Sequence, residues 1–196
     1  PNGDPLTFMW EQRDLGPASN LADGDTGKGP LFRSAAPSSN PFRSLPGLAG
    51  VLANQTIAGE GLPTTNRVLN FRVTARDGLG GVANDDMQIV VAAGNGGFAL
   101  TSQNTSSKLN ANSPVTITWN VAGTNSAPIN CTQVRLSLSV DGGQTFPIDL
   151  GTTANDGSQT LIVPNVNSSI ARIKIEAVGN IFYDINNADL NIAAAI

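Results

Sequence analysis

The sequence contains no histidine and only one cysteine, Cys131, among its 196 residues. Histidine is the commonest general base and the commonest ligand of transition metals. Without it, the chain cannot build a Ser-His-Asp triad, and with one cysteine it cannot build a structural zinc site. A single cysteine also excludes an intrachain disulfide, so hydrophobic cores or bound ions must stabilise the fold. We expect Cys131 to be a small buried hydrophobic residue, with an intermolecular disulfide as the alternative.

Charged and aromatic residues are also scarce, at 13% and 5% of the chain. The net charge is −4, and the 11 lysines and arginines are scattered. Nucleic-acid binding normally needs a basic patch, so nucleic acids and anionic membrane surfaces are disfavoured as partners. The low aromatic content argues against a row of exposed rings that binds carbohydrate. No apolar run approaches the length of a membrane span, so no membrane insertion is expected. No signal peptide is present, and Pro1 is typical of an excised or processed start.

Helical periodicity is almost absent, whereas apolar and polar residues alternate in several segments. Such alternation predicts half-buried strands. The predicted strands cover residues 6–11, 69–76, 87–91, 115–121, 134–138 and 171–177. Tight-turn sequences stand between them, at Asp77-Gly78, Asp141-Gly142-Gly143 and Asp156-Gly157. Short strands separated by such turns predict an all-β fold made of sandwiches or barrels.

Two segments interrupt this pattern. Residues 16–63 are rich in Gly, Pro, Ser and Asn and are too long for an ordinary connection between strands. Apolar residues are spaced through this segment, which predicts a loop pinned onto the sandwich rather than a free linker; they are Leu31, Phe32, Phe42, Leu45 and Leu48. The glycine-rich residues 94–97 predict a short linker between a first module, 1–93, and a second module, 98–196.

Several stretches carry a family resemblance. They are Asp-Pro-Leu-Thr-Phe-Met-Trp-Glu-Gln at 4–12, Leu-Asn-Phe-Arg-Val-Thr-Ala-Arg-Asp at 69–77, Val-Thr-Ile-Thr-Trp at 115–119, Leu-Ser-Val-Asp-Gly-Gly-Gln-Thr-Phe-Pro at 138–147 and Ala-Arg-Ile-Lys-Ile at 171–175. Together they resemble the tandem immunoglobulin- and cadherin-like modules that follow the protease domain in secreted bacterial reprolysin-like metallopeptidases. Similar modules occur in bacterial surface and adhesin-like proteins.

This resemblance implies two tandem immunoglobulin-like β-sandwiches, of the cadherin or fibronectin III kind, on a secreted or cell-surface bacterial protein. The protease's His-Glu-x-x-His signature has no counterpart in this sequence, so no peptidase activity is implied. In such modules a first strand normally precedes the Asp-Pro-x-Gly-Asp turn. Here the chain begins inside that turn, at Pro1-Asn2-Gly3-Asp4, so the first module is expected to lack one edge strand.

The missing strand leads to a further expectation about segment 6–11. It would pair with a neighbour on one side only, and unprotected strand edges template pairing with other chains. We therefore expect a strand from outside the module to cover this edge. It could come from residues upstream, from a partner protein, or from the C-terminal run 190–196 of another copy.

The resemblance also implies calcium, which cadherin-like modules often hold at a domain end. The candidate ligands are Asp4, Asp77, Asp85 and Asp86, with Asp23 and Asp25 in the long loop. The alternative is that Asp77 and Asp141 form turns and the other carboxylates are solvated. No segment has the EF-hand spacing, and no carboxylate pair stands out as catalytic. Trp10 and Trp119 lie on apolar strand faces and are expected in the cores.

The leading hypothesis is a non-catalytic extracellular structural or adhesive module pair of a larger protein. Its partners would be other domains of that protein or other copies of the chain, with calcium as the one cofactor considered. The first alternative is a subunit of an extracellular filament or sheath assembled by strand pairing between chains. The second is an accessory substrate-binding region of a secreted metallopeptidase.

Overall fold

The structure is a computed structural model that describes residues 3–18, 20, 24–94 and 96–195. It divides into two compact units, Pro1–Gly94 and Asn95–Ile196. Strands predominate, and the helix among the described residues is the short α1 (Leu48–Ala53). The all-β class predicted from the period-2 alternation is therefore confirmed. No helix in the described part of the chain is both long and apolar enough to cross a membrane.

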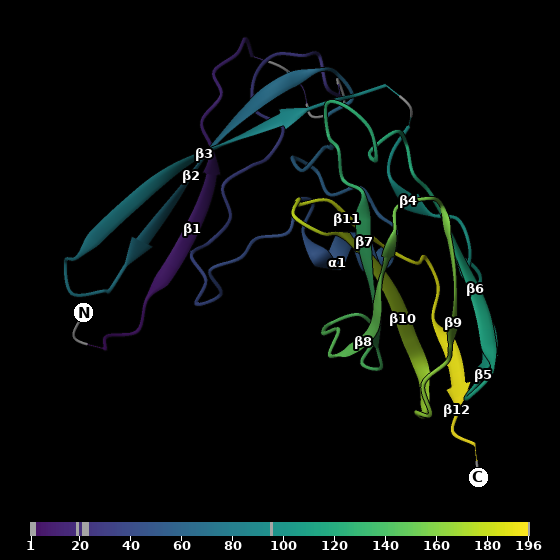
Figure 1. Cartoon of the computed structure of the whole chain (residues 1–196). Helices are drawn as coiled ribbons and strands as arrows, with labels where there is room; N and C mark the ends of the chain where they lie inside the picture. Colours follow the sequence, from purple (N-terminus) through teal and green to yellow (C-terminus); the bar gives the residue numbers. More distant parts are fainter. Residues whose placement is uncertain (1–2, 19, 21–23, 95, 196) are drawn as a thin grey trace. The chain divides into compact units, whose positions relative to one another are not determined.

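Unit 1 contains one antiparallel sheet in which β2 lies between β1 and β3 (Figure 1). Its strands are β1 (Thr7–Gln12), β2 (Arg67–Arg76) and β3 (Val82–Val91). The β2–β3 pairing runs without a register shift from Arg67–Val91 to Arg76–Val82. The connecting turn is fixed by Asp77, whose Oδ1 accepts the backbone N–H groups of Leu79 and Gly81, both at 2.8 Å. An Asp side chain that bonds to backbone N–H groups further along the chain is a common turn former.

One face of this sheet packs against the long loop. The buried cluster consists of Phe32 from the loop and Leu69 and Phe71 from β2. Partly buried apolar residues surround it: Trp10, Leu31, Leu45, Ile89 and Val91. The prediction that apolar residues pin segment 16–63 onto the sheet is thus confirmed for Leu31, Phe32 and Leu45, whereas Phe42 is 80% exposed. In the described part of unit 1 the loop occupies the place that a second sheet has in a complete sandwich.

The loop also covers the outer edge of β1. Phe8 and Ser38 form an isolated antiparallel bridge, with Phe8 N–H to Ser38 O at 2.7 Å and Ser38 N–H to Phe8 O at 2.9 Å. Arg43 Nη1 donates to the carbonyl of Trp10 at 2.7 Å. The expectation that a strand from outside covers segment 6–11 is therefore wrong, because the chain's own loop returns to this edge.

Unit 2 is a two-sheet sandwich. The larger sheet has the order β5-β12-β10-β7-β8, with β11 also paired to β10, and the smaller sheet has the order β4-β6-β9. The bounds of the larger sheet are β5 (Ser107–Asn110), β7 (Gln133–Ser139), β8 (Ile148–Ala154), β10 (Ser168–Ala177), β11 (Tyr183–Ile185) and β12 (Leu190–Ala193). Those of the smaller sheet are β4 (Ala99–Leu100), β6 (Pro114–Asn120) and β9 (Ser158–Ile162). This order gives unit 2 the architecture of an immunoglobulin-like sandwich.

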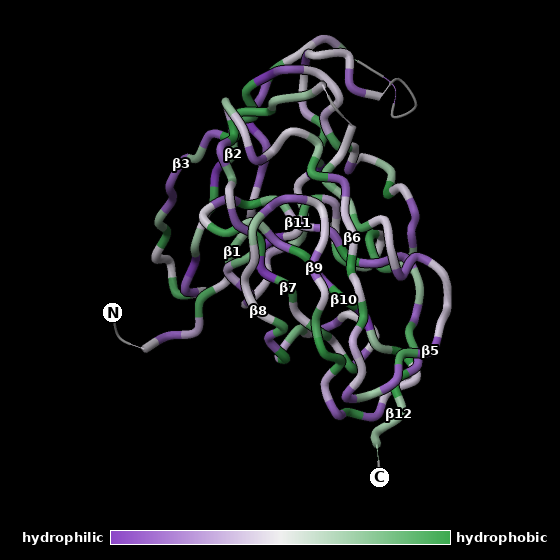
Figure 2. The backbone as a smooth tube through the Cα atoms, turned by 45° about the vertical axis from the view of Figure 1, so that its right-hand side comes forward, coloured by the Kyte–Doolittle hydropathy of each residue, from purple (hydrophilic) through white to green (hydrophobic). Residues whose placement is uncertain are grey.

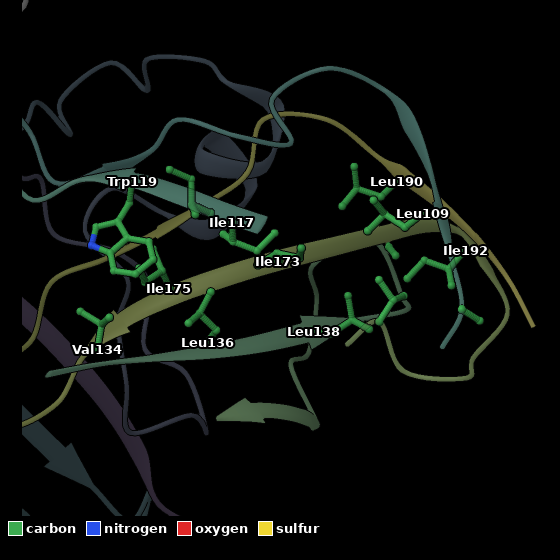
Figure 3. Packing of buried hydrophobic residues seen from close by; sticks show 14 residues of the cluster. Leu109, Ile117, Trp119, Val134, Leu136, Leu138, Ile173, Ile175, Leu190 and Ile192 are labelled. Atoms are coloured by element: carbon green, nitrogen blue, oxygen red, sulfur yellow. The ribbon is translucent and has the colours of Figure 1, made fainter. Parts of the chain in front are cut away.

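The core of unit 2 lies between its two sheets (Figure 3). Ile117 and Trp119 of β6 project from the smaller sheet toward side chains of β7 and β10, among them Leu136 and Ile175. Full burial of each such aliphatic side chain contributes about 1.5–3 kcal/mol. Trp119 and Cys131 are both 4% exposed, so their predicted burial is confirmed. Hydrophilic and hydrophobic stretches follow one another along the labelled strands in Figure 2, as expected for strands with one buried face.

Candidate functional site

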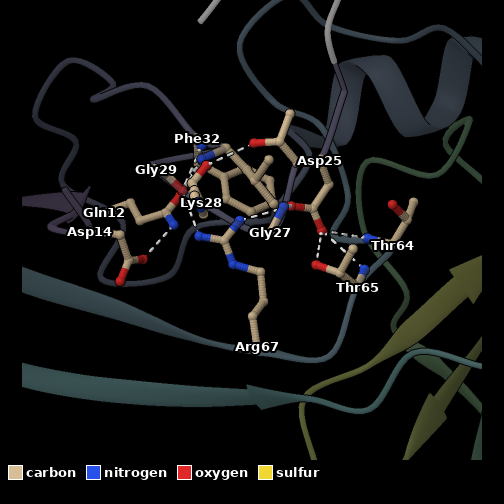
Figure 4. Close-up of polar contacts among 12 residues, drawn as sticks. Gln12, Asp14, Asp25, Gly27, Lys28, Gly29, Phe32, Thr64, Thr65 and Arg67 are labelled. Atoms are coloured by element: carbon tan, nitrogen blue, oxygen red, sulfur yellow. Dashed lines mark hydrogen bonds and ion pairs between the residues drawn. The ribbon is translucent and has the colours of Figure 1, made fainter. Parts of the chain in front are cut away.

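The long loop is tied to the sheet of unit 1 through a buried ion pair between Asp25 and Arg67 (Figure 4). Arg67 Nη1 and Asp25 Oδ1 are 2.8 Å apart, and their side chains are 7% and 0% exposed. The carboxylate also accepts the N–H groups of Gly27, Thr64 and Thr65 and the Thr65 hydroxyl, at 2.8–3.0 Å. Burial alone would raise the pKa of Asp25, but these hydrogen bonds and Arg67 hold it well below its usual range. Asp25 is therefore an ionised structural group at neutral pH.

Gln12, the last residue of β1, extends this network. Its Oε1 accepts the backbone N–H groups of Leu31 and Phe32, at 2.8 and 3.0 Å, and its Nε2 donates to Asp14. Arg67 donates from Nη2 to the carbonyl of Gly29, whereas its Nε is buried without a hydrogen-bond partner. We call the contacts of Asp25, Arg67 and Gln12 the loop clasp. The loop clasp holds the loop backbone at Gly27, Gly29, Leu31 and Phe32 and joins it to Thr64 and Thr65, just before β2.

A second ion pair fixes the middle of the loop. Arg43 Nη2 lies 2.9 Å from Glu60 Oε1, and the two side chains are 12% and 14% exposed. The same guanidinium donates to the carbonyl of Arg33, and Glu60 accepts the N–H of Gly47 ahead of α1. Trp10 Nε1 donates to the carbonyl of Pro41 at 2.9 Å. The described part of the loop is thus fastened at several points and is not a free connection.

The opposite face of the sheet carries an open hollow of about 530 Å³, lined by residues that include Arg13, Leu15, Asn70, Asp86 and Gln88. Asp86 receives two hydrogen bonds from Arg72, both at 2.7 Å, and two from Arg13 Nη1, at 3.1 and 3.4 Å. The hydrogen bond from Arg72 is the main reason that the pKa of Asp86 lies below its usual range. Asp86 is 54% exposed, so this is a solvated ion-pair cluster on a shallow surface rather than an enclosed pocket.

The structure does not bring the calcium candidates into one group. Asp4 precedes β1, Asp77 fixes the β2–β3 turn, and Asp86 of β3 pairs with Arg72 of β2 and with Arg13. The carboxylate of Asp85 accepts the N–H of Asp86 at 2.9 Å. Asp25 belongs to the loop clasp, and Asp23 lies outside the described residues. Within the described ranges, no three His, Cys, Asp or Glu residues gather as a metal site would require. Calcium binding stays a prediction.

Two buried asparagines organise unit 2, and sequence reasoning missed both. Asn155 is 2% exposed; its Oδ1 accepts Trp119 Nε1–H at 2.9 Å, and its Nδ2 donates to Thr124 Oγ1 and the Cys131 carbonyl. Asn186 is fully buried; it accepts the N–H of Ile173 and donates to the carbonyls of Gln103 and Ala188. In an Asn-rich chain no local pattern separates these two residues from exposed ones.

Two acidic residues of unit 2 have shifted pKa values in opposite directions. Hydrogen bonds from Ser139 and Thr145 hold the pKa of Asp141 well below its usual range and fix the turn between β7 and β8. This confirms the turn-former interpretation of Asp141. Burial raises the pKa of Asp184, whose Oδ2 accepts the N–H of Leu100 at 2.7 Å. That contact ties β11 to β4.

Comparisons with known proteins identify no family. No family matches the chain, and no curated protein matches it significantly. Among solved structures, the chain is similar to the N-terminal Ig1-2 module of a Drosophila receptor protein tyrosine phosphatase, with 13% identity over 72% of this chain and 73% of that chain and a TM-score of 0.37. It is also similar to the FN1-FN3 domains of chicken CNTN1, with 12% identity over 94% of this chain and 57% of that chain and a TM-score of 0.27.

A further similarity is to domains 4 and 5 of the S-layer protein SbsC, with 13% identity over 69% of this chain and 70% of that chain and a TM-score of 0.22. At these TM-scores the similarities do not bear on function. The immunoglobulin-like description of unit 2 rests on its strand order and on its core between two sheets. The reprolysin-like metallopeptidase context stays a prediction.

Proposed function

We propose that the chain is a non-catalytic structural or adhesive module pair of a larger secreted or cell-surface protein. Segment 16–63 of unit 1 is its contact surface. The partners are other domains of the same protein, other copies of the chain, or a surface that the loop contacts. The role is to space, display or dock, which needs a rigid frame and an ordered exposed loop rather than a reactive group.

The observation that carries this proposal is that the charged side chains of the loop and of the β7–β8 turn are engaged in holding the fold. Asp25 and Arg67 fasten the loop, Arg43 and Glu60 fix its middle, and Asp141 shapes a turn. Binding residues are often found on loops that a rigid scaffold positions. The loop of unit 1 has this character, since it is held by buried ion pairs while much of its length is exposed.

The pKa values of the acidic residues also support a non-catalytic role. A general acid or base works best with a pKa near the operating pH, whereas the pKa values of Asp25, Asp86 and Asp141 are lowered. Asp184 is the one carboxyl among the described residues with a raised pKa, and its Oδ2 is already bonded to the Leu100 N–H. These groups are arranged for structure.

A hydrolysis survey separates a module from an enzyme. Purified protein is incubated with chromogenic peptides, esters and glycosides, beside a parallel preparation of the Asp184→Asn variant. We expect no turnover above the buffer blank in either sample. Turnover that survives repurification and is lost in Asp184→Asn would contradict the non-catalytic assignment.

A further inference from the structure

The outer edge of β3 is the open edge of the unit 1 sheet. Phe8 points its N–H and C=O toward Ser38 and away from β2. Backbone groups alternate in direction along an antiparallel strand. Ala75 of β2 lies opposite Phe8 and Val73 lies opposite Trp10, so the backbone N–H and C=O groups of Ala75 and Val73 point toward β3. The β3 residues opposite them, Ala83 and Asp85, then face β2.

By the same alternation Met87 and Ile89 also face β2, whereas the even-numbered residues turn their backbone groups outward: Val82, Asn84, Asp86, Gln88 and Val90. The Asp86 N–H is consistent with this direction, since its acceptor is the side chain of Asp85 and not β2. No strand in the described part of the chain pairs with β3 on this side. The edge is thus a continuous row of backbone donors and acceptors that face solvent.

This edge lacks the protection that other edges of the molecule have. Proteins blunt exposed edges by keeping them short, by bulges, by proline or by charge. In unit 2 the edge strands β5, β9 and β4 have 4, 5 and 2 residues, and β8 has 7 residues with a register shift in its pairing. β3 has 10 residues, no proline and no register shift. β3 has two charged residues: Asp86 is paired with Arg72 and Arg13, and Asp85 lies opposite Val73 with its backbone groups turned toward β2 and not toward the open edge.

Exposed apolar side chains accompany the edge. Val82, Met87 and Val90 of β3 are 60%, 39% and 75% exposed. The core of unit 1 has three buried hydrophobic residues, Phe32, Leu69 and Phe71. A sheet with a small core and a long open edge gains from a further strand, because that strand pairs the free backbone groups of the edge and covers exposed apolar side chains.

We propose that this edge pairs with β3 of a second copy of the chain, antiparallel and about a two-fold axis at Met87. The two sheets then form one continuous sheet across the dimer. In this register Asp86 lies opposite Gln88 of the second copy, and Asn84 lies opposite Val90. Met87 lies opposite Met87 of the second copy, on the sheet face that carries Phe71.

The register follows from geometry and charge. Outward-facing residues must meet outward-facing residues, so adjacent allowed registers differ by two residues. Two registers use nearly the whole strand: one centres on Asp86 and the other on Met87. The first sets two Asp86 carboxylates directly opposite each other, which is unfavourable. The second sets the Asp86 carboxylate opposite the Gln88 amide of the other copy, and these two groups can form a hydrogen bond. It also buries the two Met87 side chains against each other.

An antiparallel pair about a two-fold axis is isologous, so each copy uses its β3 edge completely and the assembly closes as a dimer. A filament would need a second interface. The proposed dimer depends on the β3 edge and not on where the chain is located or on what segment 16–63 contacts. A failure of either proposal therefore leaves the other intact.

Cysteine cross-linking tests the register. Residues on the axis of a non-hydrogen-bonded pair have Cα atoms about 4.5 Å apart, within the range of a disulfide. Under mild oxidation Met87→Cys should give a disulfide-linked dimer. Val82→Cys should not, because its two copies would lie about 33 Å apart along the strands. Wild-type protein controls for the buried Cys131. Cross-linking of Asp86→Cys in place of Met87→Cys would overturn the register.

Light scattering after size exclusion tests the interface itself. Wild-type protein should be dimeric at high concentration. Gln88→Pro removes an outward N–H and no bond to β2, and should raise the dimer dissociation constant at least about tenfold. Gln88→Ala is the matched control, since both variants lose the hydrogen bond to Asn70, and it should remain dimeric. Trp10 fluorescence in a Trp119→Phe background checks that unit 1 is folded in each variant. A monomeric wild type, or a dimer that Gln88→Pro leaves unchanged, would overturn the proposal.

Discussion

The loop clasp should dominate the stability of unit 1. Asp25→Ala removes the partner of the buried Arg67 and leaves the N–H groups of Gly27, Thr64 and Thr65 without their acceptor. Removing one partner of a buried ion pair costs about 3–5 kcal/mol. With a urea dependence of about 2 kcal/mol per M, the midpoint of unit 1 should fall by about 2 M. The core of unit 1 is small, so this loss is a large fraction of its stability.

The two tryptophans allow each unit to be followed alone. Trp10 belongs to unit 1 and Trp119 to unit 2, and the chain has no others. In a Trp119→Phe background, fluorescence of Trp10 reports the unfolding of unit 1. In a Trp10→Phe background, Trp119 reports unit 2. Asp25→Ala should shift the first transition and leave the second in place.

Asp85→Ala is the matched control in unit 1, because Asp85 is an exposed aspartate on β3 whose carboxylate accepts one hydrogen bond, from the N–H of Asp86. We expect its midpoint to stay close to that of the wild type. Equal unit 1 midpoints for Asp25→Ala and Asp85→Ala would refute the view that the loop clasp holds this unit together.

Three further results are expected. Asn155→Ala should destabilise unit 2 by about 2–4 kcal/mol in urea unfolding followed by Trp119, because it leaves the Trp119 Nε1–H and the Cys131 carbonyl unpaired; a loss below about 1 kcal/mol would show that water replaces the amide. Asp184→Asn should raise the melting temperature of unit 2 at pH 7 but not at pH 3, because a raised pKa means that the ionised carboxylate opposes folding once the pH exceeds that pKa; an equal effect at both pH values would contradict this sign. If the predicted calcium site exists, EDTA should lower a melting temperature and added Ca²⁺ should restore it, because a ligand that binds only the folded state stabilises it; melting temperatures that stay unchanged across millimolar Ca²⁺ would remove the ion.

The period-2 pattern predicted those strands that separate a buried face from a solvated one. β2 is the clearest case: Leu69 and Phe71 are buried, whereas Asn70 and Arg72 project from the other face into the polar cluster of the sheet. The first half of β3 was not predicted, because Asn84, Asp85 and Asp86 show no alternation. These residues form a strand because the Asp77 turn sets them in register with β2.

The candidate site was harder to predict than the strands. Apolar spacing showed that the long loop would be pinned, but not where its polar groups would go. Asp25 and Arg67 are 42 positions apart in sequence, and no local pattern links them. The loop's return to the edge of β1 at Ser38 is equally non-local. Because that contact covers the edge of β1, the open edge of the sheet is at β3 and not at β1 as expected.

The most direct test of the proposed role is the accessibility of the chain on intact cells of its source organism. Antibodies raised against the purified protein are applied to intact and to lysed cells, with and without prior surface proteolysis. The account predicts a signal on intact cells, or in the culture medium, that proteolysis of intact cells removes. A signal that appears only after lysis, and that surface proteolysis leaves unchanged, would contradict an extracellular structural or adhesive module.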